Sequence, residues 1–156
     1  MEAMLDSTDK KILSMLSLDS RQPMAKVAEV VNLSTPAVHA RVKKLEEHGV
    51  ISGYSLNLNP RKLDRAISAF IRISIGKASC SSIADHLLEI PEVEECHSVA
   101  GEECLLVKVR AKNTEVLNQV ILRTRQIENV TKTISMVVLK TEFERPTQIL
   151  KETELP

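Results

Sequence analysis

Aromatic residues are scarce in this chain of 156 residues, which has one tyrosine, two phenylalanines and no tryptophan. Proteins that bind single-stranded nucleic acid usually stack bases on aromatic side chains, so this composition argues against single-stranded RNA as a partner. No apolar run approaches the roughly 18 residues that a membrane helix needs, and the polar start lacks the order of a signal peptide. The sequence therefore predicts a cytoplasmic protein with no membrane partner.

Excess charge of either sign is also missing, because 21 lysines and arginines balance 21 aspartates and glutamates. A nucleic-acid partner must then be held by a local basic patch and not by the field of the whole molecule. Residues 1–62 hold nine basic and seven acidic side chains, so the small positive excess lies in the first part of the chain. We expect any such patch to lie there.

The cysteines are three in number and form no C-x-x-C pair, which argues against a disulfide framework and against a zinc site. Cys96, His97 and Cys104 fall on neighbouring predicted strands, where a reactive thiol is one interpretation and buried packing is the favoured one. The four histidines have no spacing that makes a metal site. We expect no metal, no cofactor and no catalytic residue.

The spacing of apolar residues changes near residues 54–64, and this change predicts two units. Before it, the spacing is helical and predicts one helix capped within residues 7–9 and a shorter one after Pro23. A third helix is expected to begin at Ser34, a good N-cap, and to end at Gly49, a good C-cap.

After residue 64 the pattern is typical of strands separated by helices. Strands are predicted at 67–75, 93–99, 104–109 and 133–139, and helices at 81–88 and 114–127. This βαββαβ order is that of a ferredoxin-like domain, which makes the chain an α+β protein. Residues 105–107 and 136–139 are apolar on both faces, so we expect a second chain to cover the face opposite the helices, and Val137→Asp to separate the two chains.

Three short helices with a turn before the third predict a helix-turn-helix, whose last helix can enter the major groove of double-stranded DNA. At about 100° per residue, Val38, Val42 and Leu45 face inward on this helix. The outer side is small near the helix start and basic behind it, as groove entry requires. The candidate DNA-binding residues are Ser34, Thr35, Pro36, His39, Ala40, Arg41, Lys43, Lys44 and Arg21.

These candidates have different expected roles. The polar side chains Ser34, Thr35 and His39 can hydrogen-bond to bases or phosphates, whereas the lysines supply charge for phosphate. Arg41 lies at the edge of the inner side, so bracing the domain and touching DNA are both open for it. A single such domain binds weakly, and useful affinity needs two copies on two half-sites.

Two sets of residues form a pattern that covers nearly the whole chain. The first set is Leu5, Asp6, Asp9, Ile12, Leu13, Ser20, Arg21, Leu33, Ser34, Val38, Arg41, Val42, Leu45, Glu46, Gly49, Val50, Ile51, Gly53 and Tyr54. The second is Pro91, Val93, Ala100, Gly101, Val130 and Thr133. Together they resemble the Lrp/AsnC, or feast/famine, transcriptional regulators. The resemblance implies a helix-turn-helix DNA-binding domain at 1–53, a strand linker at 54–64, a ferredoxin-like effector-binding and oligomerisation (RAM-type) domain at 65–141, and a C-terminal tail at 142–156.

The resemblance also implies a homodimer that assembles to a tetramer or octamer, with a small-molecule effector, commonly an amino acid, bound between dimers. Many members have Gly-x-x-Asp-Tyr in the effector loop, whereas here Gly101 is followed by two glutamates, a cysteine and a leucine. Either glutamate could receive the ammonium of an amino acid, and a solvated turn is the alternative. The candidate effector-binding residues are Ala100, Gly101, Glu102 and Glu103, with hydroxyl donors from the next dimer at Thr131, Thr133 and Ser135.

We therefore expect a sequence-specific DNA-binding regulator and not an enzyme. One alternative is a chromatin-organising protein that wraps DNA with little sequence preference. Another is an enzyme similar to the sirohaem decarboxylases, which share this two-domain architecture, but such a site should carry His, Arg and Tyr, and Tyr54 lies in the linker. A partner-binding module that does not bind DNA is the third.

Overall fold

The computed structural model describes residues 5–145, 147 and 149, and it divides them into two units. The first unit contains residues 5–57 together with 144, 145, 147 and 149, and the second contains Leu58–Phe143. Across the described residues, no helix has the length and apolar character needed to cross a membrane. Each unit has its own apolar core, so each is described by itself.

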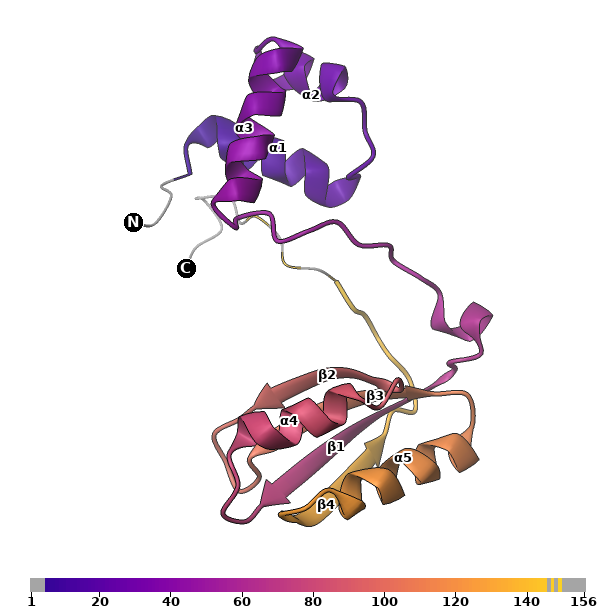
Figure 1. The fold of residues 1–156 in the computed structure, drawn as a ribbon. Coiled ribbons are helices and arrows are strands. Elements are labelled where there is room, and N and C mark those ends of the chain that lie inside the picture. The colour runs from indigo at the N-terminus through magenta and orange to yellow at the C-terminus, as the bar shows by residue number, and fades with distance from the viewer. Residues whose placement is uncertain (1–4, 146, 148, 150–156) are drawn as a thin grey trace. The chain divides into compact units, whose positions relative to one another are not determined.

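The first unit consists of three helices, α1 (Ser7–Leu18), α2 (Met24–Val31) and α3 (Thr35–Glu47) (Figure 1). Their shared core contains Ile12, Val27 and Val38, which are fully buried. The cap of α1 differs from the prediction, because Asp6 and not a residue within 7–9 is the N-cap. Asp6 is the N-cap because it forms a capping box with Asp9, and this capping box satisfies two backbone N–H groups at once.

Both ends of α3 are as predicted. The side chain of Ser34 accepts a hydrogen bond from the backbone N–H of Ala37, at 3.3 Å. Proline at 36 is tolerated in the first turn, where its missing N–H has no partner to lose. Gly49 follows the C-cap with a φ of +69°, a conformation that favours glycine.

The segment predicted as a strand linker forms no strand within one copy of the chain, and Pro60–Leu63 (η1) is a 3-10 helix. Its sequence does alternate in the manner of a strand, with Tyr54, Leu56 and Leu58 exposed. A strand is stable only when a neighbouring strand completes its hydrogen bonds. The physical reason for the difference is therefore that strand-like side-chain alternation alone supplies no pairing partner.

The second unit is the predicted βαββαβ arrangement. Its elements are β1 (Ile67–Ile75), α4 (Cys80–Leu88), β2 (Val93–Ser98), β3 (Leu105–Ala111), α5 (Thr114–Gln126) and β4 (Val130–Val137). The strands form one antiparallel sheet in the order β2-β3-β1-β4, and α4 and α5 lie on the same side of it (Figure 1). The last strand starts three residues earlier than predicted, because its first residues already pair with the end of β1.

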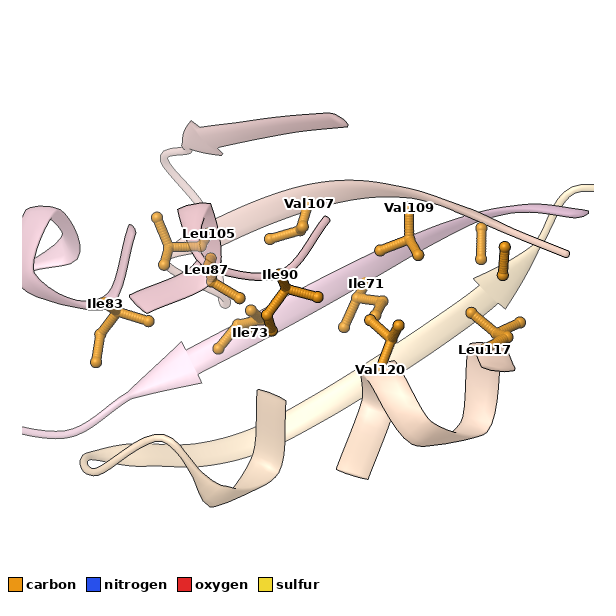
Figure 2. Packing of buried hydrophobic residues seen from close by; sticks show 12 residues of the cluster. Ile71, Ile73, Ile83, Leu87, Ile90, Leu105, Val107, Val109, Leu117 and Val120 are labelled. Atoms are coloured by element: carbon orange, nitrogen blue, oxygen red, sulfur yellow. The ribbon is translucent and has the colours of Figure 1, made fainter. Parts of the chain in front are cut away.

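The core of this unit lies between the sheet and the two helices. Figure 2 shows strand residues such as Ile71, Ile73 and Val107 pointing toward Leu87 and Val120 of the helices. All five are at most 1% exposed. Since alternate residues of a strand point to opposite faces, the residues between them lie on the face away from the helices.

The strand register corrects one expected interface residue. Val137 pairs with the buried Ala69, so it lies on the helix side of the sheet and not on the opposite face. The opposite face instead carries Met136, paired with Phe70, and Leu106, paired with Arg72. Met136 is 43% exposed. A substitution that tests whether another chain covers this face therefore belongs at Met136.

Candidate functional site

The surface of α3 divides as the helical spacing predicts. Val38, Val42 and Leu45 are 0%, 6% and 4% exposed and hold the helix against α1 and α2. The other side is exposed and carries Pro36, His39, Ala40, Lys43 and Lys44, with Glu47 beside Lys43. The side chains of Pro36 and Ala40 are small, and the two lysines follow one turn later. This side therefore allows the helix to approach DNA closely and also supplies positive charge.

Three of the DNA-binding candidates already have a contact within the first unit. Ser34 uses its oxygen as the helix cap and keeps its hydroxyl hydrogen for a further partner. Lys43 lies 3.7 Å from Glu47 in an exposed pair, a contact that water and salt screen strongly. Arg21 lies outside α3, in the turn after α1, where its backbone N–H is bound by Asp19 and its side chain is exposed.

Arg41 is the candidate whose surroundings differ most from a free DNA contact. Its Nη1 lies 2.7 Å from Oδ2 of Asp6 and 2.8 Å from Oδ1 of Asp9. These two carboxylates, Asp6 first, raise the pKa of the Arg41 guanidinium above its ordinary value. We call Asp6, Asp9 and Arg41 together the Arg41 cluster.

The chain leaving α3 is anchored to that helix, a feature that the sequence reasoning missed. Backbone N–H groups of Val50 and Ile51 both donate to the carbonyl of Leu45, and Ile51 packs on the helical core. The hydroxyl of Tyr54 then donates to Oε1 of Glu46, at 2.8 Å. The spacing of eight residues, with Gly53 between, gave no local signal for this bond.

The Tyr54–Glu46 bond can be tested by titration, because the chain has no other tyrosine and its phenolate absorbance reports this site alone. Partial burial, and then the hydrogen bond to Glu46, raise the pKa of Tyr54 above its ordinary value of 10.0. We expect Glu46→Gln to move the absorbance midpoint to lower pH without fully returning it to that value. Glu47→Gln is the matched control, and an equal shift in both variants would contradict the bond.

The candidate effector loop contains one buried carboxylate, that of Glu103, which pairs with a partly exposed arginine on β1. Glu102 is exposed, whereas Glu103 is 7% exposed and its Oε2 lies 3.4 Å from Nη1 of Arg72 on β1. Oε1 of Glu103 and Nε of Arg72 are buried and have no hydrogen-bond partner among the described residues. A buried carboxylate oxygen without a donor is costly, so this position favours a further cation or N–H group.

The other effector candidates lie at the same end of the sheet. Leu105, at the end of the loop, and Thr133 on β4 both pair with Ile73, one on each side of β1. Thr131 donates from its hydroxyl to the carbonyl of Ser74, and Thr133 accepts from Nε of Arg125. Ala100, Gly101 and Ser135 are exposed. The register therefore places the loop and the β4 hydroxyls about two strand spacings, roughly 10 Å, apart.

Two of the three cysteines are packing residues. Cys80 and Cys96 are partly buried and pack against the core of the second unit. Burial, and then the proximity of Cys80, raise the pKa of the Cys96 thiol, which lowers its thiolate fraction. In the described part of the chain no three His, Cys, Asp or Glu side chains gather in a way that could hold a metal ion.

Two family models match the chain, and together they cover both units. The first, described as winged helix-turn-helix DNA-binding, matches residues 5–52. The second, described as Lrp/AsnC ligand binding domain, matches residues 68–148. These spans include α3 in the first model, and the Glu103 loop with β4 in the second.

Individual relatives agree with the family models. The chain is 35% identical over 156 residues to the HTH-type transcriptional regulator FL11 of Pyrococcus furiosus, covering 100% of this chain and 99% of that protein. The structure of E. coli AsnC superposes with a TM-score of 0.86 at 25% identity, over 92% of this chain and 98% of that one. The feast or famine regulatory protein of M. tuberculosis in complex with L-methionine gives a TM-score of 0.87 at 34% identity, over 94% and 99% of the two chains. The names are those of transcriptional regulators and not of enzymes.

Proposed function

We propose, on the premise that the chain belongs to the Lrp/AsnC family of DNA-binding transcriptional regulators, that α3 is the element that enters the major groove. The observation that carries this proposal is the division of α3 into a buried side with Val38 and an exposed side with Ala40 and Lys43. In a helix-turn-helix the second helix of the motif, which is α3 in this chain, presents its N-terminal residues to base edges. Ser34, Thr35 and His39 would contact bases or phosphates, and Lys43, Lys44 and Arg21 would contact phosphates, with Pro36 and Ala40 allowing close approach.

The sheet unit is proposed to bring two such DNA-binding units together. The face with Phe70, Leu106 and Met136 supplies apolar area for a second copy of the chain. Two copies allow two half-sites to be read, which a single unit with a net charge near zero needs for useful affinity. Dimers would join into a tetramer or an octamer.

The effector is proposed to be an amino acid. Two structures similar to this one are complexes with L-methionine, one from M. tuberculosis and one from Neisseria meningitidis. In this chain Glu103, with its unpartnered Oε1, is proposed to receive the ligand ammonium, with the backbone near Ala100 and Gly101 receiving its carboxylate. Glu102, and from the neighbouring dimer the hydroxyls of Thr131, Thr133 and Ser135, would complete the site. The effector acts only through its different affinity for two assemblies or domain arrangements.

The effector site makes a calorimetric prediction. Titration of the full chain with L-methionine and L-leucine should find binding that weakens roughly tenfold or more in Glu103→Gln, because a charge-assisted hydrogen bond is lost. Glu102→Gln, on the exposed neighbour, is the matched control and should change the affinity less. Equal affinity in both variants and in the parent chain would place the ligand elsewhere.

Mapping of bound DNA across the source genome, with and without added amino acids, tests the regulator function as a whole. Discrete sites whose occupancy changes with one amino acid are the expected result. Even coverage of the genome would favour the DNA-wrapping alternative.

A further inference from the structure

We propose that Arg41 is a positioning residue for DNA binding: the Arg41 cluster fixes how α3 lies on α1, and Arg41 does not act by neutralising phosphate. Its Nη1 is held at 2.7 and 2.8 Å by carboxylates that are 35 and 32 residues away in sequence. The inference rests on the proposed function, in which α3 enters the major groove, and it adds a role for residues that do not face the groove.

The two carboxylates of the cluster are fixed before they meet Arg41. Oδ1 of Asp6 accepts from the backbone N–H of Asp9 at 2.7 Å, and Oδ2 of Asp9 accepts from the N–H of Asp6 at 3.3 Å. Each then has one oxygen left, and both of these oxygens bind the same Arg41 nitrogen. The same two carboxylates therefore cap α1 and bind Arg41 of α3, so the capping box holds them rigidly in the position that binds Arg41.

Between the helices, α3 also packs on α1 and α2 through apolar side chains. This packing through Val38, Val42 and Leu45 stabilises the contact between the helices, but apolar contacts have little directional preference. Charge-assisted hydrogen bonds depend on geometry, so the cluster limits rotation and sliding of α3. Two carboxylates against one guanidinium leave a net charge of −1, which repels phosphate. The backbone N–H of Asp9, and then Arg41, lower the pKa of Asp6, which keeps it ionised.

A substitution at Asp6 separates positioning from electrostatics by the sign of its effect. Asp6→Asn keeps an N-cap oxygen, since asparagine caps as well as aspartate, but removes the charge toward Arg41. If Asp6 only repels DNA, the variant binds DNA more tightly. If the cluster positions α3, the variant binds about three- to tenfold more weakly, since each copy on an operator loses a partly exposed ion pair. Asp19→Asn, at the other end of α1, removes the same charge without touching α3 and should bind equally well or slightly more tightly.

The salt dependence gives a second, independent readout. Arg41→Met keeps the apolar stem and should lower the affinity by a similar factor with an unchanged slope of log affinity against log salt. Loss of a phosphate contact would instead reduce the slope by about 0.9 per copy. The double variant with Asp6→Asn should be no weaker than Arg41→Met alone, because both remove one shared interaction.

All variants are measured as full chains beside the parent on one operator fragment, so failure of the parent to bind would be a failure of DNA recognition and not of this inference. Circular dichroism measures the helix content of each variant. If Asp6→Asn loses α1, the slope of log affinity against log salt for Arg41→Met tests the proposal alone. Tighter binding by Asp6→Asn, or a reduced slope for Arg41→Met, overturns the proposal.

Discussion

Replacing Lys43 and Lys44 together with alanine should lower the DNA affinity by roughly 10²–10³-fold near 0.1 M salt, on all DNA sequences alike. Both side chains are exposed on the outer side of α3, and the ion pair of Lys43 with Glu47 is long, at 3.7 Å, and exposed. Each phosphate contact releases about 0.9 counterion, so four lysines in two copies should reduce the slope of log affinity against log salt by roughly 3 to 4. Fluorescence anisotropy with a labelled operator at several salt concentrations measures both quantities.

The matched control removes the same charge from the sheet unit. Lys62→Ala with Lys77→Ala takes two exposed lysines from the second unit and should leave the slope nearly unchanged. A slope equally reduced in both double variants would mean that the total charge matters and the position on α3 does not. A parent slope retained after loss of Lys43 and Lys44 would remove them from the phosphate contacts.

Those features that depend on local spacing could be predicted from the sequence. The inner position of Val38 and Val42 follows from the helical period, and the end of α3 follows from Gly49, because each is decided within a few residues. The βαββαβ order likewise follows from the alternation of apolar residues, since strand and helix periods differ.

Features that depend on distant residues could not be predicted. The link from Arg41 to Asp6 joins residues 35 positions apart, so the spacing left bracing and DNA contact equally open. The apolar neighbours of Val137 predict an interface residue, but the face on which it lies depends on pairing with Ala69, almost 70 residues earlier. The burial of Glu103 beside Arg72 also depends on tertiary structure, whereas adjacency in sequence makes Glu102 and Glu103 equivalent.

Met136→Asp should convert the assembled protein to monomers and thereby weaken DNA binding. Met136 is 43% exposed in one chain and shares a face with Phe70, where a second copy is proposed to dock. A twofold interface would bury two introduced carboxylates without partners, and such burial costs several kcal/mol. The dimer dissociation constant should rise at least about a hundredfold. Light scattering after size-exclusion chromatography measures the mass directly.

Val137→Asp is the matched control, because it introduces the same charge one residue later, on the helix side of the sheet. Val137 is 52% exposed on the helix side, so its aspartate stays in contact with water and the dimer should persist. Dissociation by Val137→Asp with retention of the parent mass in Met136→Asp would show that the helix side and not the Phe70 face joins the copies. Only joined copies can bind two half-sites. The monomer formed by Met136→Asp should therefore lose the steep dependence of operator binding on protein concentration. Its weak binding to nonspecific DNA through α3 should persist.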